Sequence, residues 1–234
     1  MAELHRVVVG AAYWRLHPRV RRWAAELPKQ QRLDEAFDRD FGVDTAGEVR
    51  LEDAGVAEYD VERGHGYYRP VWTYPFRQAI EAIPSDLRQF TFVDYGSGKG
   101  KALLLASDYP FREIVGIEFA PALHEVPARN IERYASATQR CHAVRSECRD
   151  ALQFAPPLQP LVCFFFNPFD DATMAAVLDR LQESVSRHPR DVFIVYTNMR
   201  SVGEHEQVLR DRRGLVVVAR QPLYLILKIS ASIP

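Results

Sequence analysis

Beyond residue 90 the sequence alternates short apolar runs with longer amphipathic stretches. Most of these runs are a few residues long and mainly apolar, which is typical of a strand buried on both faces. The runs predict strands at Phe90–Tyr95, Ile114–Phe119, Cys141–Cys148, Leu161–Phe166 and Val192–Thr197. The stretches between them predict helices at Lys99–Ser107, Pro121–Ala135, Asp171–Arg187 and near Val202–Arg212. Regular alternation of this kind indicates a parallel sheet with helices on both faces.

The end of the chain departs from this rhythm. Two apolar runs, Leu215–Ala219 and Leu223–Ile229, are separated only by Arg220–Pro222. A connection that short cannot hold a crossover helix, so the two strands must run antiparallel. The predicted fold is therefore α/β, a Rossmann-like three-layer sandwich whose mostly parallel seven-stranded sheet ends in an antiparallel hairpin.

The first third of the chain lacks this alternation. Apolar residues at helical spacing, among them Leu33, Phe37 and Phe41 ahead of Gly42, predict an N-terminal helical cap or extension. We expect the cap to cover residues 1–62 and the α/β domain to cover residues 63–234.

Charge is unevenly distributed within that extension. Residues 1–32 hold seven basic and two acidic side chains, whereas residues 33–62 hold eleven acidic and two basic ones. The two halves can pack against each other through this complementarity. Alternatively, the acidic half is a lid that selects a cationic substrate, or the basic half contacts RNA.

The bulk composition favours a cytoplasmic protein. The net charge is −1, which gives no general attraction to nucleic acid or to an anionic membrane. Three scattered cysteines, with Cys163 expected in the core, indicate reduced thiols rather than a metal site. The apolar patch Val7–Trp14 is far shorter than the roughly 20 residues that a membrane helix needs. We therefore expect that the protein does not bind a membrane, and we do not favour nucleic acid as a partner. The oligomeric state stays open.

A glycine-rich loop follows the first predicted strand. It reads Asp94-Tyr95-Gly96-Ser97-Gly98-Lys99-Gly100 and leads into a helix, where glycines permit sharp turns and close approach of a ligand. The phosphate-binding P-loop is excluded because position 102 is alanine, and the dinucleotide fingerprint is disfavoured because its glycines are spaced differently. Lysines early in a helix are usually solvated, so we assign Lys99 and Lys101 no role.

The spacing Asp-x-Gly-x-Gly-x-Gly resembles that of the class I S-adenosylmethionine (SAM)-dependent methyltransferases, over roughly residues 63–234. The resemblance includes the terminal hairpin and implies SAM as the cofactor. It implies that Glu118, at the end of the second strand, binds the ribose hydroxyls, and that Asp150, after the third, contacts the adenine amino group. Asp94 would bind the methionine amino group or brace the loop. The remaining implied cofactor contacts are Gly96, Ser97, Gly98, Gly100 and Asn167.

The fourth strand ends at Asn167-Pro168-Phe169. This stretch is similar to the Asn-Pro-Pro-Tyr/Phe motif of amino-group methyltransferases, in which the asparagine oxygen and a proline carbonyl accept N–H bonds from the substrate. The second proline is absent, which leaves the position of that carbonyl open. The resemblance implies a catalytic role for Asn167, Pro168 and Phe169 and an amine acceptor, from a small molecule or a lysine-like protein side chain. Alternatively, Asn-Pro only terminates the strand.

An aromatic segment precedes the first strand and offers further candidates. His65 is the histidine that we would test as a base. Candidates for contact with the acceptor or the adenine are Tyr68, Trp72 and Tyr74, with Asn198 after the fifth strand. For the aromatic residues, ordinary packing against the sheet is an equal alternative.

Other functions stay open at this stage. An O-methyltransferase with a divalent metal on Asp170, Asp171 and Asn198 matches the spacing poorly, and Asp171 would equally cap the next helix. We therefore expect no metal. The rivals are a small-molecule O-methyltransferase, a non-catalytic SAM-binding regulatory protein and, less favoured, a nicotinamide-dependent oxidoreductase.

Overall fold

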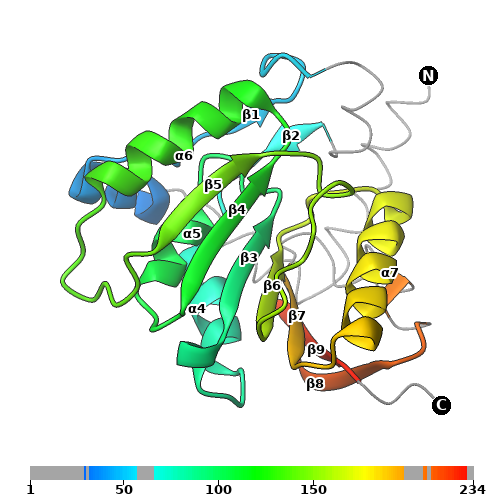
Figure 1. Ribbon diagram of the computed structural model, residues 1–234. Coiled ribbons are helices and arrows are strands. Elements are labelled where there is room, and N and C mark those ends of the chain that lie inside the picture. The colour runs from blue at the N-terminus through cyan, green and yellow to red at the C-terminus, as the bar shows by residue number, and fades with distance from the viewer. Residues whose placement is uncertain (1–28, 30–31, 57–65, 198–207, 210–211, 231–234) are drawn as a thin grey trace, which may run out of the picture.

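The computed structural model describes residues 29, 32–56, 66–197, 208–209 and 212–230. Within these residues a seven-stranded sheet has the order β5-β4-β3-β6-β7-β9-β8 (Figure 1). The strands are β3 (Thr91–Tyr95), β4 (Glu113–Glu118), β5 (Val144–Cys148), β6 (Leu161–Phe165), β7 (Val192–Thr197), β8 (Leu215–Gln221) and β9 (Tyr224–Ile229). Strands β5, β4, β3, β6 and β7 pair in parallel, whereas β9 is antiparallel to both β7 and β8. The predicted fold, with its C-terminal hairpin, is confirmed.

Helices cover both faces of this sheet. On one face α4 (Thr73–Glu81), α5 (Lys101–Ser107) and α6 (Pro121–Arg133) pack with the short 3-10 turn η1 (Leu87–Gln89) nearby. On the other face lies α7 (Asp171–Arg187), and the helical residues Val208 and Leu209 belong to the same apolar core (Figure 1). Each face has its own apolar core: Phe92 and Phe164 point toward α4 and α5, and Val93 and Phe165 point toward α7. This alternation is what a strand with both faces buried requires.

Several predicted boundaries shift by a few residues. The helix expected from Lys99 begins at Lys101, because Gly100 has a left-handed backbone (φ 84°) that ends the loop. The strand expected from Cys141 begins at Val144, and β8 continues through Gln221, so that only Pro222 and Leu223 connect it to β9. The helix expected near residues 202–212 lies mostly outside the described residues, as do the helices expected before residue 29.

The extension is partly helical and partly extended. Residues 32–41 form a helix that ends at Gly42, as predicted. Phe37 and Phe41 pack against each other with ring centroids 4.9 Å apart, but Leu33 is 47% exposed and so does not share their buried face. Beyond this helix, β1 (Val49–Arg50) pairs antiparallel with β2 (Tyr67–Tyr68), which joins the extension to the α/β domain.

Candidate functional site

The carboxyl ends of five neighbouring strands lie on one level of the sheet. Tyr95 of β3 pairs with Ile117 on one side and Phe165 on the other, and these two pair in turn with Glu147 and Tyr196. Loops that leave parallel strands at one level meet at one edge, which is where open α/β sheets bind ligands. The segments that leave this level carry Gly96–Gly100, Glu118, Asp150 and Asn167–Phe169.

The glycine loop is fixed by close contacts as well as by its turn. The backbone N–H groups of Gly96 and Ser97 both donate to the carbonyl oxygen of Ile117, at 2.8 and 3.0 Å. Gly96 and Gly98 have positive φ values of 82° and 51°. A β-carbon at Gly96 would lie 2.6 Å from the β-carbon of Pro168. The folded chain itself therefore needs a glycine here, apart from any ligand.

The side chain of Ser97 points toward β4. Its Oγ is buried, has no hydrogen-bond partner among the described residues, and would lie 2.7 Å from a β-carbon at Gly116. Gly116 is a structural requirement that the sequence pattern did not single out, because the contact joins residues on separate elements. Any contact of Ser97 with a cofactor would come from its backbone.

Glu118 is buried at the end of β4. Its side chain binds the backbone of the glycine loop and the backbone just after β4. Its Oε2 accepts a hydrogen bond from Gly98 N at 2.7 Å, and its Oε1 accepts one from Ala120 N at 2.8 Å. Burial raises the pKa of Glu118, while these N–H donors act in the opposite direction. The carboxylate predicted to bind ribose is thus already oriented by the backbone.

Asp94 lies buried beneath the same loop. The Asp94 side chain accepts no hydrogen bond from any described residue. Burial, and to a lesser extent the nearby Glu118 carboxylate, raises the pKa of Asp94 well above its ordinary value. A buried carboxyl group without a partner is costly in a folded protein. Titratable groups whose pKa is strongly shifted are concentrated at functional sites.

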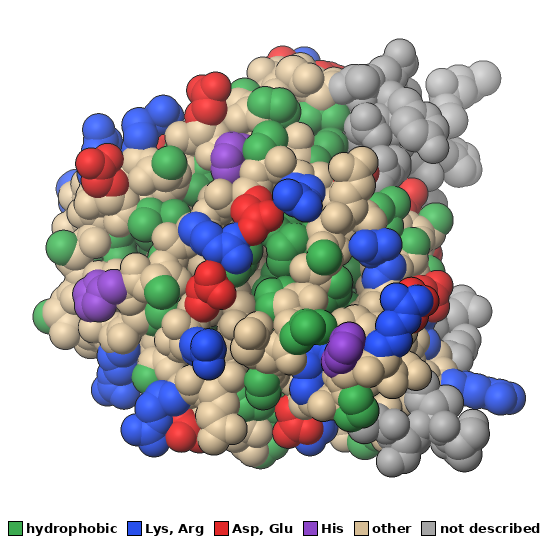
Figure 2. All heavy atoms as spheres, viewed as in Figure 1, with side chains coloured by type: hydrophobic (Ala, Val, Ile, Leu, Met, Phe, Trp, Pro, Cys, Tyr) green, Lys and Arg blue, Asp and Glu red, His purple; other side chains and the backbone are tan. Residues whose placement is uncertain are grey.

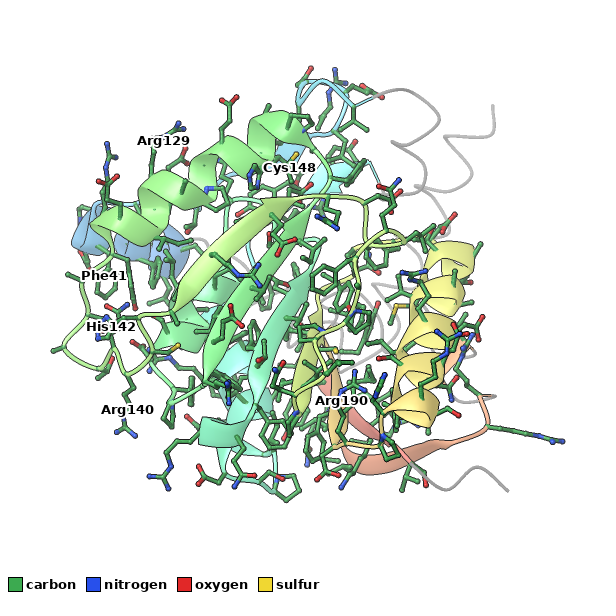
Figure 3. All side chains as sticks on the ribbon, viewed as in Figure 1. Phe41, Arg129, Arg140, His142, Cys148 and Arg190 are labelled. Atoms are coloured by element: carbon green, nitrogen blue, oxygen red, sulfur yellow. The ribbon has the colours of Figure 1, made fainter. Side chains whose placement is uncertain are left out.

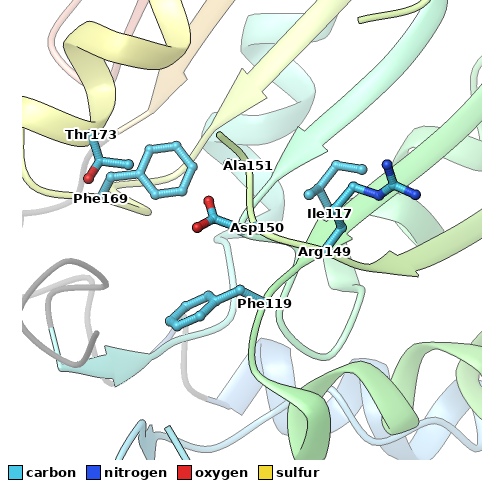
Figure 4. A pocket seen from close by; sticks show the side chains of 8 residues that line it. Ile117, Phe119, Arg149, Asp150, Ala151, Phe169 and Thr173 are labelled. Atoms are coloured by element: carbon cyan, nitrogen blue, oxygen red, sulfur yellow. The ribbon is translucent and has the colours of Figure 1, made fainter. Parts of the chain in front are cut away.

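An open pocket of about 360 Å³, measured with the space at its mouth, lies at this edge. Its lining residues come from the end of β4, from the loops that follow β3, β4, β5 and β6, and from α7: Gly96, Ile117, Phe119, Arg149, Asp150, Ala151, Phe169 and Thr173. In Figure 4 the Asp150 carboxylate and the rings of Phe119 and Phe169 point into one space, whereas the Arg149 guanidinium points away from it. Asp150 Oδ1 also accepts a hydrogen bond from Leu152 N at 2.8 Å, which fixes one of its oxygens.

The Asn167 turn is the most unusual piece of backbone at the site. Asn167 has φ 48° and is the one non-glycine residue with a positive φ in the described part of the chain. Its Oδ1 accepts a hydrogen bond from the Tyr196 hydroxyl at 3.0 Å. Phe169 is buried and meets Phe165 edge to face, with ring centroids 6.3 Å apart. Left-handed backbone at a residue with a side chain is strained and is concentrated at functional sites.

The aromatic candidates divide into buried and exposed residues. Tyr68 and Trp72 are buried, whereas Tyr74 is 60% exposed. Burial raises the pKa of Tyr68 well above its ordinary value, so its hydroxyl stays protonated and donates to Thr45 O at 2.7 Å. His65 and Asn198 lie outside the described residues.

The interpretation of the two lysines as solvated was wrong. The Lys101 side chain is 1% exposed and forms an ion pair with Asp34, whose side chain is 7% exposed. Lys99 pairs with Asp44 at 2.7 Å. The acidic half of the extension therefore pairs with lysines of the α/β domain. The paired residues are 55 and 67 positions apart in the sequence, so no local sequence pattern indicates the pairing.

The neighbouring aspartates act as helix-terminal residues. The side chain of Asp170, rather than that of Asp171, caps α7 by accepting a hydrogen bond from Thr173 N at 2.7 Å. Among the described residues no group of three His, Cys, Asp or Glu side chains could hold a metal ion. No described helix is both long and apolar enough to cross a membrane.

Beside the pocket, the α7-side face of β4 and β5 carries charged side chains. Arg145 pairs with Glu113 and Glu147, and Glu147 lies 3.5 Å from Arg149 at the pocket rim. Figure 2 shows acidic and basic side chains next to each other over the middle of this face. The alternating signs balance locally, so this face is a solvated surface rather than a patch of one charge.

Comparisons with known proteins give likenesses of fold at low identity. No protein-family model matches the sequence, and no curated protein sequence matches it. An RNA methyltransferase from Salinibacter ruber, in complex with S-adenosyl-L-homocysteine, is 15% identical, with 70% of this chain and 96% of that chain covered and a TM-score of 0.46. Magnesium protoporphyrin IX methyltransferase from Synechocystis PCC 6803 is 12% identical (66% and 76% covered, TM-score 0.45). The N,N-8-amino-8-demethyl-D-riboflavin dimethyltransferase from Streptomyces davawensis is 14% identical (67% and 54% covered, TM-score 0.48).

Proposed function

We propose that the protein is a SAM-dependent methyltransferase whose acceptor is an amine nitrogen of a small molecule or of a lysine-like protein side chain. One observation carries the proposal. The pocket is lined jointly by the glycine loop at Gly96, by Phe119 after β4, by Asp150 after β5 and by Phe169 of the Asn167 turn. The sequence resemblance expects contacts to the cofactor or the acceptor from Gly96, Asp150 and Phe169, and Phe119 directly follows Glu118, the expected ribose ligand.

The charges around the pocket suit a cationic ligand. Asp94 offers a buried carboxyl without a hydrogen bond from a described residue, and Glu118 and Asp150 add two more acids at the same edge. The SAM molecule supplies a methyl group on a positively charged sulfur, and it also carries an ammonium group. Asp94 would hold the ammonium, Glu118 the ribose hydroxyls and Asp150 the adenine amino group. The rings of Phe119 and Phe169 would cover the apolar parts and exclude water.

Asn167 would orient the acceptor. A neutral amine has N–H groups that need acceptors while its lone pair faces the methyl group, and positioning of this kind supplies several kcal/mol of rate enhancement in favourable cases. The Asn167 Oδ1 takes one hydrogen bond from Tyr196 and keeps a second lone pair for an amine N–H. The left-handed backbone of Asn167 turns the chain so that Pro168 lies against Gly96, next to the pocket.

Titration calorimetry tests the proposal most directly. The protein should bind SAM and S-adenosylhomocysteine and should not bind NADH. Transfer of a radiolabelled methyl group from SAM to a panel of small amines and of lysine-bearing proteins should then identify the acceptor. Binding of NADH without SAM would refute the proposal, and binding of SAM with transfer only to hydroxyl acceptors would replace nitrogen by oxygen. Binding of SAM without transfer to any acceptor would favour the regulatory rival.

A further inference from the structure

An acidic part of the extension, residues 34–46, lies directly against the glycine loop. Lys99 lies between Gly98 and Gly100 in the loop. Its ammonium group donates to Asp44 Oδ1 at 2.7 Å and to Ala46 O at 3.1 Å. The Lys99 side chain is only 13% exposed, although Asp44 is open to solvent. The loop is thus attached to a segment that lies more than 50 residues earlier in the sequence.

Asn130 of α6 makes the second attachment. Its Oδ1 accepts a hydrogen bond from Asp44 N, and its Nδ2 donates to both Asp44 O and Lys99 O, all at 2.8 Å. The side chain is 1% exposed, whereas its neighbour Arg129 points out from the helix into solvent (Figure 3). One buried amide therefore joins the acidic segment, the glycine loop and α6, with the amide oxygen and both amide hydrogens used.

The segment also has internal contacts and a deeper anchor. Asp38 Oδ2 accepts hydrogen bonds from the N–H groups of Thr45 and Ala46, at 2.7 and 2.6 Å. The Thr45 carbonyl accepts the hydroxyl of Tyr68, whose ring packs on Gly98. At its other end Asp34 pairs with the buried Lys101, the first residue of α5. Contacts therefore reach the loop at Gly98, at Lys99 and just after Gly100.

We propose that residues 34–46 form a clamp that holds the glycine loop in its ligand-binding conformation, with Asn130 as the positioning residue that couples the two. Three glycines within five residues give the loop many conformations, and fixing them in advance reduces the cost of binding a ligand. The proposal rests on the proposed function only in naming the ligand as SAM or its product. The acidic side chains Asp44 and Asp34 then pair with Lys99 of the loop and Lys101 of α5, rather than with a cationic substrate.

The clamp makes a reciprocal prediction. If docking of residues 34–46 favours the ligand-binding loop, a ligand on the loop must favour docking by the same factor. S-adenosylhomocysteine should therefore slow hydrogen exchange in residues 34–46, although the pocket is lined by residues from other segments.

Amide hydrogen exchange of Asn130→Ala tests the clamp without any ligand. We expect exchange in peptides that cover residues 43–46 and 96–100 to accelerate about tenfold or more, since three hydrogen bonds are lost. Peptides from α7 and β7 should exchange as in the wild type. His124→Ala is the matched control, because it removes a hydrogen bond from the same helix to Ser146, at 3.0 Å, and does not involve the loop.

A second variant guards against loss of folding. Lys99→Met removes the partly exposed link to Asp44 and should accelerate exchange in the same two segments by a smaller factor. Uniform acceleration along the chain, or no change in residues 96–100, would overturn the clamp and leave Asn130 a residue of general stability.

The ligand measurement separates this inference from the proposed function. S-adenosylhomocysteine affinity should fall about tenfold in Asn130→Ala and stay unchanged in His124→Ala. If the wild type binds no S-adenosylhomocysteine, the proposed function fails, while the exchange data still decide whether the clamp exists. If the wild type binds it and Asn130→Ala binds it equally well, the clamp has no role in binding and the inference is refuted.

Discussion

The ring of Tyr68 lies directly over Gly98. A β-carbon at position 98 would stand 2.2 Å from two carbons of the ring, far inside van der Waals contact. The ring cannot withdraw freely, because the Tyr68 hydroxyl donates to Thr45 O at 2.7 Å and the side chain is buried against Ala120 and Leu123. The contact between Tyr68 and Gly98 therefore links the position of β2 to the conformation of the glycine loop.

Gly98→Ala should destabilise the protein more than Gly42→Ala does. Both glycines have positive φ, but a β-carbon at Gly42 meets nothing within 4 Å. Gly42→Ala should cost about 1–2 kcal/mol of unfolding free energy from the backbone alone. Gly98→Ala should cost about 1–3 kcal/mol more, the usual range for overpacking. Urea unfolding measures both, and equal costs would mean that Tyr68 moves aside freely.

Removing one partner of the buried pair Asp34–Lys101 should cost more stability than replacing both partners with apolar residues. Burial raises the pKa of Asp34 and lowers the pKa of Lys101, in each case against the attraction of the partner, so desolvation dominates the pair. Lys101→Met leaves a buried carboxyl without its cation and should cost about 3–5 kcal/mol. Asp34→Leu combined with Lys101→Met should recover most of that loss, as apolar replacements of buried ion pairs often do.

Thermal and urea unfolding of Lys101→Met, of Asp34→Leu and of the double variant measure this difference in stability. The exposed pair Arg39–Asp40 is a suitable control, because breaking it should change stability little. A double variant no more stable than Lys101→Met would mean that the pair, rather than its burial, stabilises the contact between the extension and α5.

Local sequence patterns predicted the strands and their ligand-binding edge well. The apolar runs locate β3, β6 and β7 because each strand is buried on both faces, and the glycines mark the loop because the turn itself needs them. The pattern could not predict Lys101–Asp34, Asn130 or Gly116. Each of these depends on a partner in another element, and a lysine in an amphipathic stretch has the same one-dimensional signature whether it is solvated or buried.

Asp94→Asn should stabilise the protein at neutral pH and weaken SAM binding. The pKa of Asp94 is raised above its ordinary value of 3.8 in the folded state. Between pH 3.8 and the raised folded-state pKa, Asp94 is ionised in the unfolded chain and still protonated in the folded protein, so the free energy of unfolding falls as pH rises. Above the folded-state pKa this loss of stability is constant. The gain from Asp94→Asn should therefore be near zero below pH 3.8, grow as pH rises, and then level off.

Melting temperatures of Asp94→Asn and wild type between pH 3 and pH 8 check this sign. Asp86→Asn gives the opposite case, because hydrogen bonds from Arg88 lower the pKa of that exposed carboxyl. A gain that is largest at acid pH would mean that Asp94 is stabilised as a carboxylate. SAM affinity, measured by calorimetry at neutral pH, should fall, because the ammonium group of SAM favours the ionised form of Asp94 and an asparagine cannot ionise.

Glu118→Ala should weaken SAM binding by about tenfold or more. The variant removes the predicted ribose ligand and also leaves Gly98 N and Ala120 N without their acceptor. Glu118→Gln keeps one carbonyl oxygen and should fall between wild type and Glu118→Ala. Glu113→Ala, at the other end of β4 and paired with the exposed Arg145, should bind as the wild type does. Unchanged affinity in Glu118→Ala would place the ribose elsewhere.

Asn167→Ala and Asn167→Gly together separate the side chain of Asn167 from its backbone. Both remove the amide that accepts from Tyr196, but only glycine adopts φ 48° without strain, so Asn167→Gly should be more stable than Asn167→Ala by about 1 kcal/mol. If the amide positions the acceptor amine, both variants should lose methyl transfer while their SAM affinity changes far less. Calorimetry and radiolabelled methyl transfer to the acceptor identified for the wild type measure the two effects. Transfer that survives in Asn167→Gly and not in Asn167→Ala would assign Asn167 to the turn alone, because the backbone conformation would then be the only property of Asn167 that the reaction needs.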